Sequence, residues 1–387
     1  MRSFESEIEA LRSQSLHRRL RVLDSAQGAA ITLAKKCGEA LNFSSNDYLG
    51  LANTEALREA MIEGVRRFGA GSGASRLVCG TLSPHVALEA AIADFKGAEA
   101  AVAFGSGFAA ATGALPALLG KGDAILLDKL SHASLIDGAR LSGATIRVFP
   151  HNDLGKLEAL LGWARRTLAG DARVIVATEA IFSMDGDRAP LREIAGLKDR
   201  FGALLLVDEA HAIGVCGPGG RGLAAELGCG DRVDLKMGTL SKALGCSGGY
   251  LAGSAALIDL LINRARSFIY STAPPPAVAF AARRAIEISA SPDGDARRAR
   301  LWQNLRAFAA ALDLPEPPSA IVPIIAGREE AALAAAAKLL EGGILAPAIR
   351  FPTVARGSAR LRLSFSAAHT PGQVSALADA IRSLALG

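Results

Sequence analysis

Short apolar runs alternate with longer segments of helical periodicity over most of the chain. Seven runs have the length and continuity of buried strands, and each is bounded by glycine or polar residues: AAVAF at 100–104, AILLD at 124–128, TIRVF at 145–149, RVIVATE at 173–179, ALLLVDE at 203–209, VDLKMG at 233–238 and GGYLAG at 248–253. Three intervening segments carry apolar residues with a period near 3.6: 82–97, 154–170 and 189–202. Strands that alternate with helices predict an α/β fold with a mostly parallel sheet and helices on both faces.

The two ends of the chain have a different pattern. Phe4, Ile8 and Leu11 stand at helical spacing before a basic cluster, which predicts an amphipathic helix over residues 1–24. Beyond the proline-rich STAPPPA segment (271–277), helical and strand-like patterns alternate. An Ala/Arg-rich helical stretch at 277–312 is followed by the apolar run SAIVPIIAG, a helix at 329–341 and the run RLRLSFSAAH at 360–369. This order is typical of a smaller α+β domain.

Together these patterns predict three parts. We expect an N-terminal helical segment at 1–45, a large α/β domain at 46–276 that binds the ligand, and a small C-terminal α+β domain at 277–387.

The composition of the 387 residues is that of a globular protein, because 50% are hydrophobic and 21% are charged. The N-terminus lacks the apolar core of a secretory signal, and no apolar run reaches the ~20 residues of a membrane span. The cysteines have neither C-x-x-C nor metal-ligand spacing: Cys37, Cys79, Cys216, Cys229 and Cys246. We therefore expect reduced thiols, no metal site, no membrane partner and a cytoplasmic location.

The net charge of +5 does not indicate a nucleic-acid-binding protein. Its basic residues are scattered in pairs among acidic ones, whereas a nucleic-acid interface requires a concentrated basic stripe or interleaved aromatic residues. A modest positive field is instead compatible with an anionic small substrate.

Polar side chains follow the predicted strands at their carboxyl ends, where open α/β sheets bind ligands. Asp208 and His211 follow the strand at 203–209, and Lys242 follows the strand at 233–238 in a loop rich in glycine and hydroxyl groups, including Thr239. Taken alone, Asp208 can be a simple turn cap and Lys242 a solvated surface residue. A lysine becomes a useful nucleophile only in an enclosed cleft.

Three further strand ends strengthen the case for a cleft. Gly105 and Gly107 lie between a strand and a helix, where free backbone N–H groups can bind a phosphate; His132 and Ser183 follow two other strands. The segment GAGSGAS at 69–75 follows no clear strand and is not a dinucleotide fingerprint. A cofactor that carries a phosphate, forms a Schiff base with lysine and pairs its ring nitrogen with a carboxylate is pyridoxal phosphate.

At these residues the chain resembles the α-oxoamine synthase family of fold-type I pyridoxal-phosphate enzymes, from about residue 16 to residue 370. The segments that carry the resemblance include NFSSNDYLGL (42–51), DKLSHASLIDGARLS (128–142), TEAIFSMDGDRAPL (178–191), VDEAHAIGVCGPGGRG (207–222), GTLSKALGCSGGY (238–250) and IRFPTVARGSARLRLSFSAAHT (349–370).

The resemblance implies roles for individual residues at the cofactor. Lys242 forms the Schiff base and moves the α-proton, Asp208 pairs with the pyridine nitrogen, His211 hydrogen-bonds the phenolic oxygen and His132 stacks on the ring. The remaining cofactor residues are implied to hold the phosphate or to lie beside the ring: Gly107, Phe108, Thr239, Ser183, and Thr272 from a neighbouring subunit. The family resemblance also implies a homodimer with its active site at the subunit interface.

For the substrates, the resemblance implies that Asn46, His132 and Arg362 hold an amino acid, with Arg362 on its carboxylate. Thr353 and a basic residue of HRRLR, either Arg18 or Arg21, are implied to meet the acyl donor. The markers favour the member that condenses L-alanine with a pimeloyl thioester in biotin biosynthesis and releases CO₂. Phe351 and Ala355 depart from the family's usual sequence, which leaves the acyl-chain length open.

Two other functions remain open at this point. A sister enzyme such as glycine C-acetyltransferase, 5-aminolevulinate synthase or serine palmitoyltransferase has the same machinery. A non-catalytic partner subunit with this fold is a different class, but such a chain would be expected to lose Lys242.

Overall fold

The computed structural model describes residues 3–14, 16–34 and 38–384. The chain divides into two compact units, of which the larger comprises Leu49–Ser183 and Asp187–Ala299 and the smaller comprises Met1–Tyr48, Met184–Gly186 and Arg300–Gly387. In this division residues 277–299, which the sequence pattern suggests as the start of the small domain, belong to the larger unit. The N-terminal segment belongs to the smaller one, and the domain limits expected from the sequence stay a prediction.

The larger unit is built on a sheet in the order β3-β9-β8-β7-β6-β4-β5. Its strands match the seven apolar runs: β3 (Ala100–Phe104), β4 (Ala124–Asp128), β5 (Thr145–Phe149), β6 (Val174–Glu179), β7 (Leu204–Asp208), β8 (Leu235–Thr239) and β9 (Gly249–Gly253). Only β9 among these strands runs against its neighbours, so the sheet is mostly parallel as the sequence predicts. All five residues of β4 are buried, which explains why AILLD reads as one continuous apolar run.

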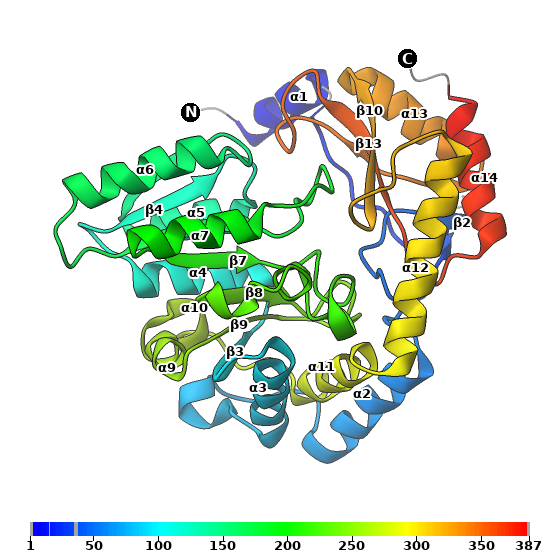
Figure 1. The fold of residues 1–387 in the computed structure, drawn as a ribbon. Helices are drawn as coiled ribbons and strands as arrows, with labels where there is room; N and C mark the ends of the chain where they lie inside the picture. Colours follow the sequence, from blue (N-terminus) through cyan, green and yellow to red (C-terminus); the bar gives the residue numbers. More distant parts are fainter. Residues whose placement is uncertain (1–2, 15, 35–37, 385–387) are drawn as a thin grey trace. The chain divides into compact units, whose positions relative to one another are not determined.

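Helices cover both faces of this sheet (Figure 1). Helix α4 packs against β3, β8 and β9 on one face, and α6 and α7 pack against β4, β5 and β7 on the other. Alternate strand residues such as Val102, Ile125 and Leu206 join α4 in one buried cluster, because successive side chains of a strand point to opposite faces.

The helical segments of the larger unit are α2 (Glu55–Phe68), η1 (Arg76–Gly80), α3 (Ser83–Lys96), α4 (Gly107–Leu118), α5 (Ala133–Ser142), α6 (Leu154–Thr167), α7 (Leu191–Phe201), η2 (Pro218–Gly220), α8 (Leu223–Glu226), η3 (Gly230–Arg232), α9 (Ala255–Arg264), α10 (Arg266–Ile269) and α11 (Pro276–Ser289). Helix α12 (Pro292–Ala311) continues from this unit into the smaller one. The stretch predicted as helical at 277–312 is thus two helices, and Pro292 begins the second, where proline is tolerated.

The smaller unit contains two small sheets and the terminal helices. One sheet has the order β1-β2-β11 and the other β10-β13-β12. The elements are α1 (Phe4–Ser13), β1 (Ala30–Leu33), β2 (Gly38–Asn42), β10 (Ile321–Gly327), α13 (Glu329–Glu341), β11 (Ile344–Leu345), β12 (Ala348–Ile349), β13 (Ala359–Ser364) and α14 (Pro371–Arg382). Cys37 lies outside the described residues.

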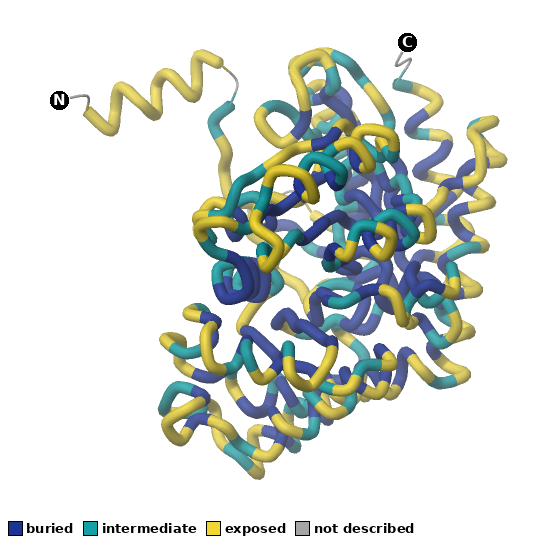
Figure 2. The backbone as a smooth tube through the Cα atoms, turned by 60° about the vertical axis from the view of Figure 1, so that its left-hand side comes forward, coloured by how far each residue is buried: buried dark blue, intermediate teal, exposed yellow. Residues whose placement is uncertain are grey.

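The N-terminal helix is shorter than predicted. It ends at Ser13, and Leu23 instead pairs with Leu33 of β1, so the prediction of one helix over 1–24 is wrong beyond that point. The apolar side chains Phe4, Ile8 and Leu11 are exposed, and Figure 2 shows α1 as an exposed helix. A helix with no buried residue gains nothing from packing, which explains why it does not extend.

Among the described residues no helix combines the length and apolar character needed to cross a membrane.

Candidate active site

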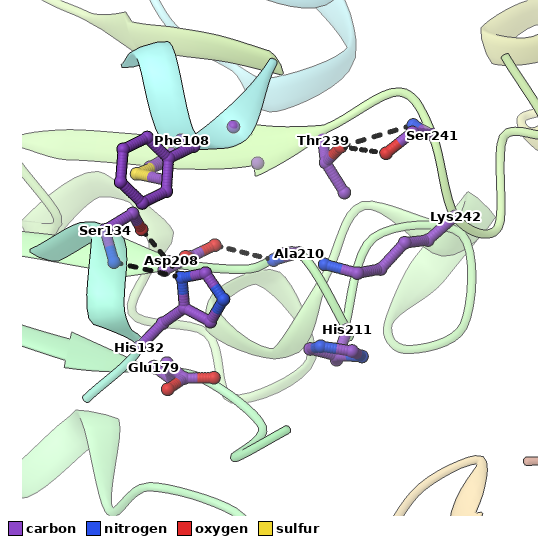
Figure 3. A pocket seen from close by; sticks show the side chains of 13 residues that line it. Phe108, His132, Ser134, Glu179, Asp208, Ala210, His211, Thr239, Ser241 and Lys242 are labelled. Carbon is purple, nitrogen blue, oxygen red and sulfur yellow. Dashed lines mark hydrogen bonds between the residues drawn. The ribbon is translucent and has the colours of Figure 1, made fainter. Parts of the chain in front are cut away.

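A pocket lies at the carboxyl ends of β4, β6, β7 and β8 in the larger unit. Its cavity volume is about 180 Å³, and Figure 3 shows the side chains that line it. The lining residues are Gly107, Phe108, His132, Ser134, Glu179, Asp208, Ala210, His211, Met237, Gly238, Thr239, Ser241 and Lys242. The structure therefore brings together seven of the residues selected from the sequence: Gly107, Phe108, His132, Asp208, His211, Thr239 and Lys242.

Helix α4 begins at this pocket. Its N-cap is Ser106, whose Oγ accepts a hydrogen bond of 3.0 Å from the backbone N–H of Ala109. The N–H groups of the first helical turn, at Gly107 and Phe108, have no acceptor within the helix and form an anion-binding end. A side chain at Gly249 would approach the backbone nitrogen of Gly107 to 2.4 Å, so glycine at 249 lets β9 lie against this helix end.

Lys242 stands in the loop between β8 and β9. Thr239 Oγ1 donates to the carbonyl oxygen of Gly248 (2.8 Å) and lies 2.7 Å from Ser241 Oγ, which ties the two ends of the loop together. Gly245 has φ +65°, and a Cβ there would lie 2.5 Å from the nitrogen of Ala52. The close approach expected from the glycine-rich sequence is therefore present. Figure 3 shows the Lys242 side chain reaching into the pocket.

Asp208 ends β7 on the opposite side of the pocket from Lys242 (Figure 3) and is only 4% exposed. Its Oδ1 accepts a hydrogen bond of 2.9 Å from the N–H of Ala210. Burial raises the pKa of this carboxyl, while the charge of Lys242 and the N–H of Ala210 act in the opposite direction. A buried carboxyl of this kind is stabilised as an anion when a cationic group is brought against it.

Two imidazoles line the same pocket. His132 is the N-cap of α5, and its Nδ1 lies 2.8 Å from Ser134 Oγ. Burial lowers the pKa of His132, and Lys242 lowers it further, although Asp208 partly compensates. The ring is therefore neutral near pH 7 and suited to stacking. His211 is buried at 5% exposure beyond the end of β7.

These features fit pyridoxal phosphate. The N-terminus of α4 is suited to the phosphate, the Asp208 carboxyl to a protonated ring nitrogen, and the Lys242 amine to the aldehyde. Ser183 and Thr272 do not line the pocket in the described chain. Ser183 is half-buried after β6, whereas Thr272 is exposed and pairs with Ser75.

Apart from His132, the residues expected to bind substrates belong to the smaller unit. The buried guanidinium of Arg362 donates from its Nη1 to Asn46 Oδ1 (3.2 Å) and to Ser364 Oγ (2.8 Å). Asn46 Oδ1 also accepts a hydrogen bond of 3.1 Å from the hydroxyl of Tyr48. Elsewhere in this unit Arg18 Nη2 donates to Thr353 Oγ1 (3.2 Å), while Arg21 is exposed. Asn46 is thus in contact with Arg362, and Arg18 with Thr353; their expected roles in substrate binding stay predictions.

A histidine outside the pocket holds the loop that contains Ser183. His151 Nδ1 lies 3.0 Å from Asp128 Oδ1, and its Nε2 lies 2.7 Å from Asp187 Oδ2. Asp187 belongs to the turn that is closed by the bridge between Ile181 and Arg188. Burial opposes the charged imidazole, but the hydrogen bonds to Asp128 and Asp187 outweigh it and raise the pKa of His151.

The raised pKa of His151 predicts a specific pH dependence of stability. Because the pKa of His151 is raised in the folded state, protonation of this ring stabilises the fold. The contribution is complete below the unfolded-state pKa of histidine near 6.5, and it is lost as the pH rises through the folded-state pKa. We expect the urea midpoint of the native protein to fall over that window more steeply than that of His151→Gln, measured by circular dichroism. Equal slopes for the two proteins would contradict the charged bridge.

Sequence reasoning missed Glu179 as a pocket residue. It is the last residue of β6, only 2% exposed, and burial raises its pKa well above the ordinary value for glutamate. An acidic residue that closes the apolar run RVIVATE is the signal that could have identified it, because the same position in the next strand is Asp208.

Comparison with known proteins gives consistent results. The family model for class I and II aminotransferases matches residues 39–381. The chain is 49% identical to an 8-amino-7-oxononanoate synthase of Geobacter metallireducens, over 95% of this chain and 94% of the relative. Among solved structures, serine palmitoyltransferase of S. paucimobilis with bound PLP is similar at a TM-score of 0.91 and 30% identity, covering 98% of this chain and 96% of that one. An 8-amino-7-oxononanoate synthase structure from Francisella tularensis is similar at a TM-score of 0.74 and 30% identity, over 89% and 96% of the two chains.

Proposed function

The chain belongs to the class I and II aminotransferase family and, within it, to the 8-amino-7-oxononanoate synthases, which are the pyridoxal-phosphate acyltransferases of biotin biosynthesis. We therefore propose that it condenses L-alanine with a pimeloyl thioester. The observation that carries this proposal is the pocket where Lys242, Asp208 and the N-terminus of α4 meet, in a chain 49% identical to a named synthase. The products are 8-amino-7-oxononanoate, CO₂ and the free thiol of the acyl carrier.

When bound, pyridoxal phosphate supplies an electron sink that stabilises negative charge at the α-carbon of the amino acid. The backbone N–H groups of Gly107 and Phe108, together with Thr239, would hold its phosphate. Asp208 keeps the ring nitrogen protonated, which is the role that its burial and its position opposite Lys242 support. His132 would stack on the ring and His211 would donate to the phenolic oxygen, while Ser183, which does not line the pocket in this structure, would have to approach the ring when the cofactor binds.

The chain's own groups also bind the substrates and move protons. Lys242 Nζ removes the α-proton and later returns a proton at the same carbon, as a positioned general base does. Arg362 binds the carboxylate of alanine through its guanidinium fork, supported by the contact to Asn46. Arg18 and Thr353, which are hydrogen-bonded to each other, meet the acyl donor.

We also propose that a second copy of the chain forms part of the active site. Leu77, Val78 and Tyr270 are exposed at 53%, 79% and 71% and lie on neighbouring segments, since Ser75 pairs with Thr272. Apolar side chains gathered in this way favour burial against a partner, and we assign them to a homodimer in which Thr272 reaches the partner's phosphate site. Among the described residues Cys79, Cys216, Cys229 and Cys246 form no disulfide, which is compatible with the reducing cytoplasm, where we place the protein.

The experiment that tests this function is a substrate panel with the purified protein and pyridoxal phosphate. Alanine, glycine and serine are each paired with pimeloyl-, acetyl-, succinyl- and palmitoyl-CoA and with the pimeloyl carrier-protein thioester, and CO₂ release is measured. The proposal predicts the highest kcat/KM for alanine with a pimeloyl thioester. A preference for glycine with acetyl-CoA would identify glycine C-acetyltransferase instead, and serine with palmitoyl-CoA would identify serine palmitoyltransferase.

A further inference from the structure

Glu179 and Asp208 are neighbouring carboxyls on the floor of the pocket. They end adjacent parallel strands, β6 and β7, and their Cα atoms are register partners. Both side chains line the pocket, with Glu179 only 2% exposed and Asp208 4% exposed. The roles implied by the family resemblance use Asp208 and leave Glu179 without a function.

The two oxygens of Glu179 have different surroundings. The backbone N–H groups of His132 and Ser183 donate to the carboxyl, whereas Oε1 is buried without a hydrogen-bond partner in the described residues. The carboxyl thus has two backbone donors near it and one oxygen without a partner. The two donors connect the end of β6 to the loop that contains Ser183 and to His132, the residue that caps α5 and lines the pocket.

The charges around Glu179 favour its neutral form. Burial raises the pKa of this carboxyl, and the negative charge of Asp208 raises it further, while Lys242 and the two N–H donors act in the opposite direction. Two carboxyls that share one enclosed site do not ionise together readily.

We propose that Glu179 is a positioning residue that keeps a proton on its carboxyl and accepts from the His132 backbone, so that of these two carboxyls Asp208 alone is charged. This inference rests on the proposed function of the pocket as the pyridoxal-phosphate site. If Glu179 is uncharged, Asp208 is the carboxylate of this pair that stabilises the protonated ring nitrogen. The same carboxyl, once ionised, would compete for the cations of the pocket.

The test compares Glu179→Gln, which keeps a neutral acceptor of the same shape, with Glu179→Ala, which removes the acceptor. Exposed Glu59 supplies the control Glu59→Gln. For each protein the dissociation constant of pyridoxal phosphate and the pH midpoint of the bound cofactor's absorbance are measured. We expect the affinity of Glu179→Gln for pyridoxal phosphate to stay within about twofold of the native value, with an unchanged pH midpoint. Glu179→Ala should bind the cofactor about 10-fold or more weakly, because in this variant two buried N–H groups lose their acceptor.

Three results would overturn the inference. The first is a midpoint shifted by about one pH unit or more in Glu179→Gln, because such a shift would mean that the substitution changes the charge of the site. The second is native behaviour of Glu179→Ala, and the third is the absence of a protonated carboxyl at position 179. The last is read from the infrared carbonyl band of the cofactor-free protein at pH 7, which should be lost in Glu179→Gln and kept in Glu59→Gln. Because this measurement needs no cofactor, it stands even if Glu179→Ala does not fold. If the native chain fails to bind pyridoxal phosphate at all, the proposed function fails separately.

Discussion

Lys242→Ala is expected to lower the turnover of the condensation by about 10²–10⁴ or more, because a positioned general base contributes about that factor to the rate. The same substitution removes the amine that binds the cofactor covalently, so the near-visible absorbance of the loaded protein should disappear as well. Steady-state CO₂ release and an absorbance scan of the dialysed holoprotein measure the two effects.

A matched control separates this role from a general effect of losing a lysine. Lys156 is exposed on α6, outside the residues that line the pocket, and Lys156→Ala should leave both turnover and absorbance unchanged. Retention of the covalent absorbance band in Lys242→Ala would refute the assignment of the nucleophile.

Asp208→Asn is the second substitution with a large expected effect. It removes the charge that faces the ring nitrogen but keeps the size of the side chain and an acceptor for the N–H of Ala210. A hydrogen bond to a charged group contributes about 1.5–3 kcal/mol, so cofactor binding should weaken about 10- to 100-fold. Turnover should fall further, because an unprotonated ring stabilises the α-carbanion poorly.

Fluorescence titration of pyridoxal phosphate measures the binding part of this effect. The control is Asp171→Asn, at an exposed position beyond the pocket, which should bind like the native protein. Unchanged affinity and turnover in Asp208→Asn would mean that the carboxyl at 208 serves only as a turn cap.

Much of the larger unit could be predicted from the sequence. The runs that became β4, β6 and β7 are almost continuously apolar because central parallel strands are buried on both faces. The polar residues that follow the parallel strands converge because these strands end at one edge of the sheet. Lys242, Asp208 and His132 were found in this way. The family resemblance added the roles that spacing alone leaves open.

Other features could not be derived from the pattern. The apolar stripe of Phe4, Ile8 and Leu11 predicts a helix but does not reveal that nothing in the described chain packs against it. The role of Glu179 was missed because a strand-end acid looks like a cap. Only the three-dimensional structure shows that one of its oxygens is buried without a partner and that backbone N–H groups of two loops lie at its carboxyl.

The most direct test of the account is to fix the cofactor to the protein and to locate it. The holoprotein is treated with borohydride, which reduces a carbon–nitrogen double bond to a stable single bond, and is then digested and examined by mass spectrometry. The account predicts one phosphopyridoxyl group per chain, on the peptide that contains Lys242. A label on any other lysine, or no label on a protein saturated with pyridoxal phosphate, would contradict it.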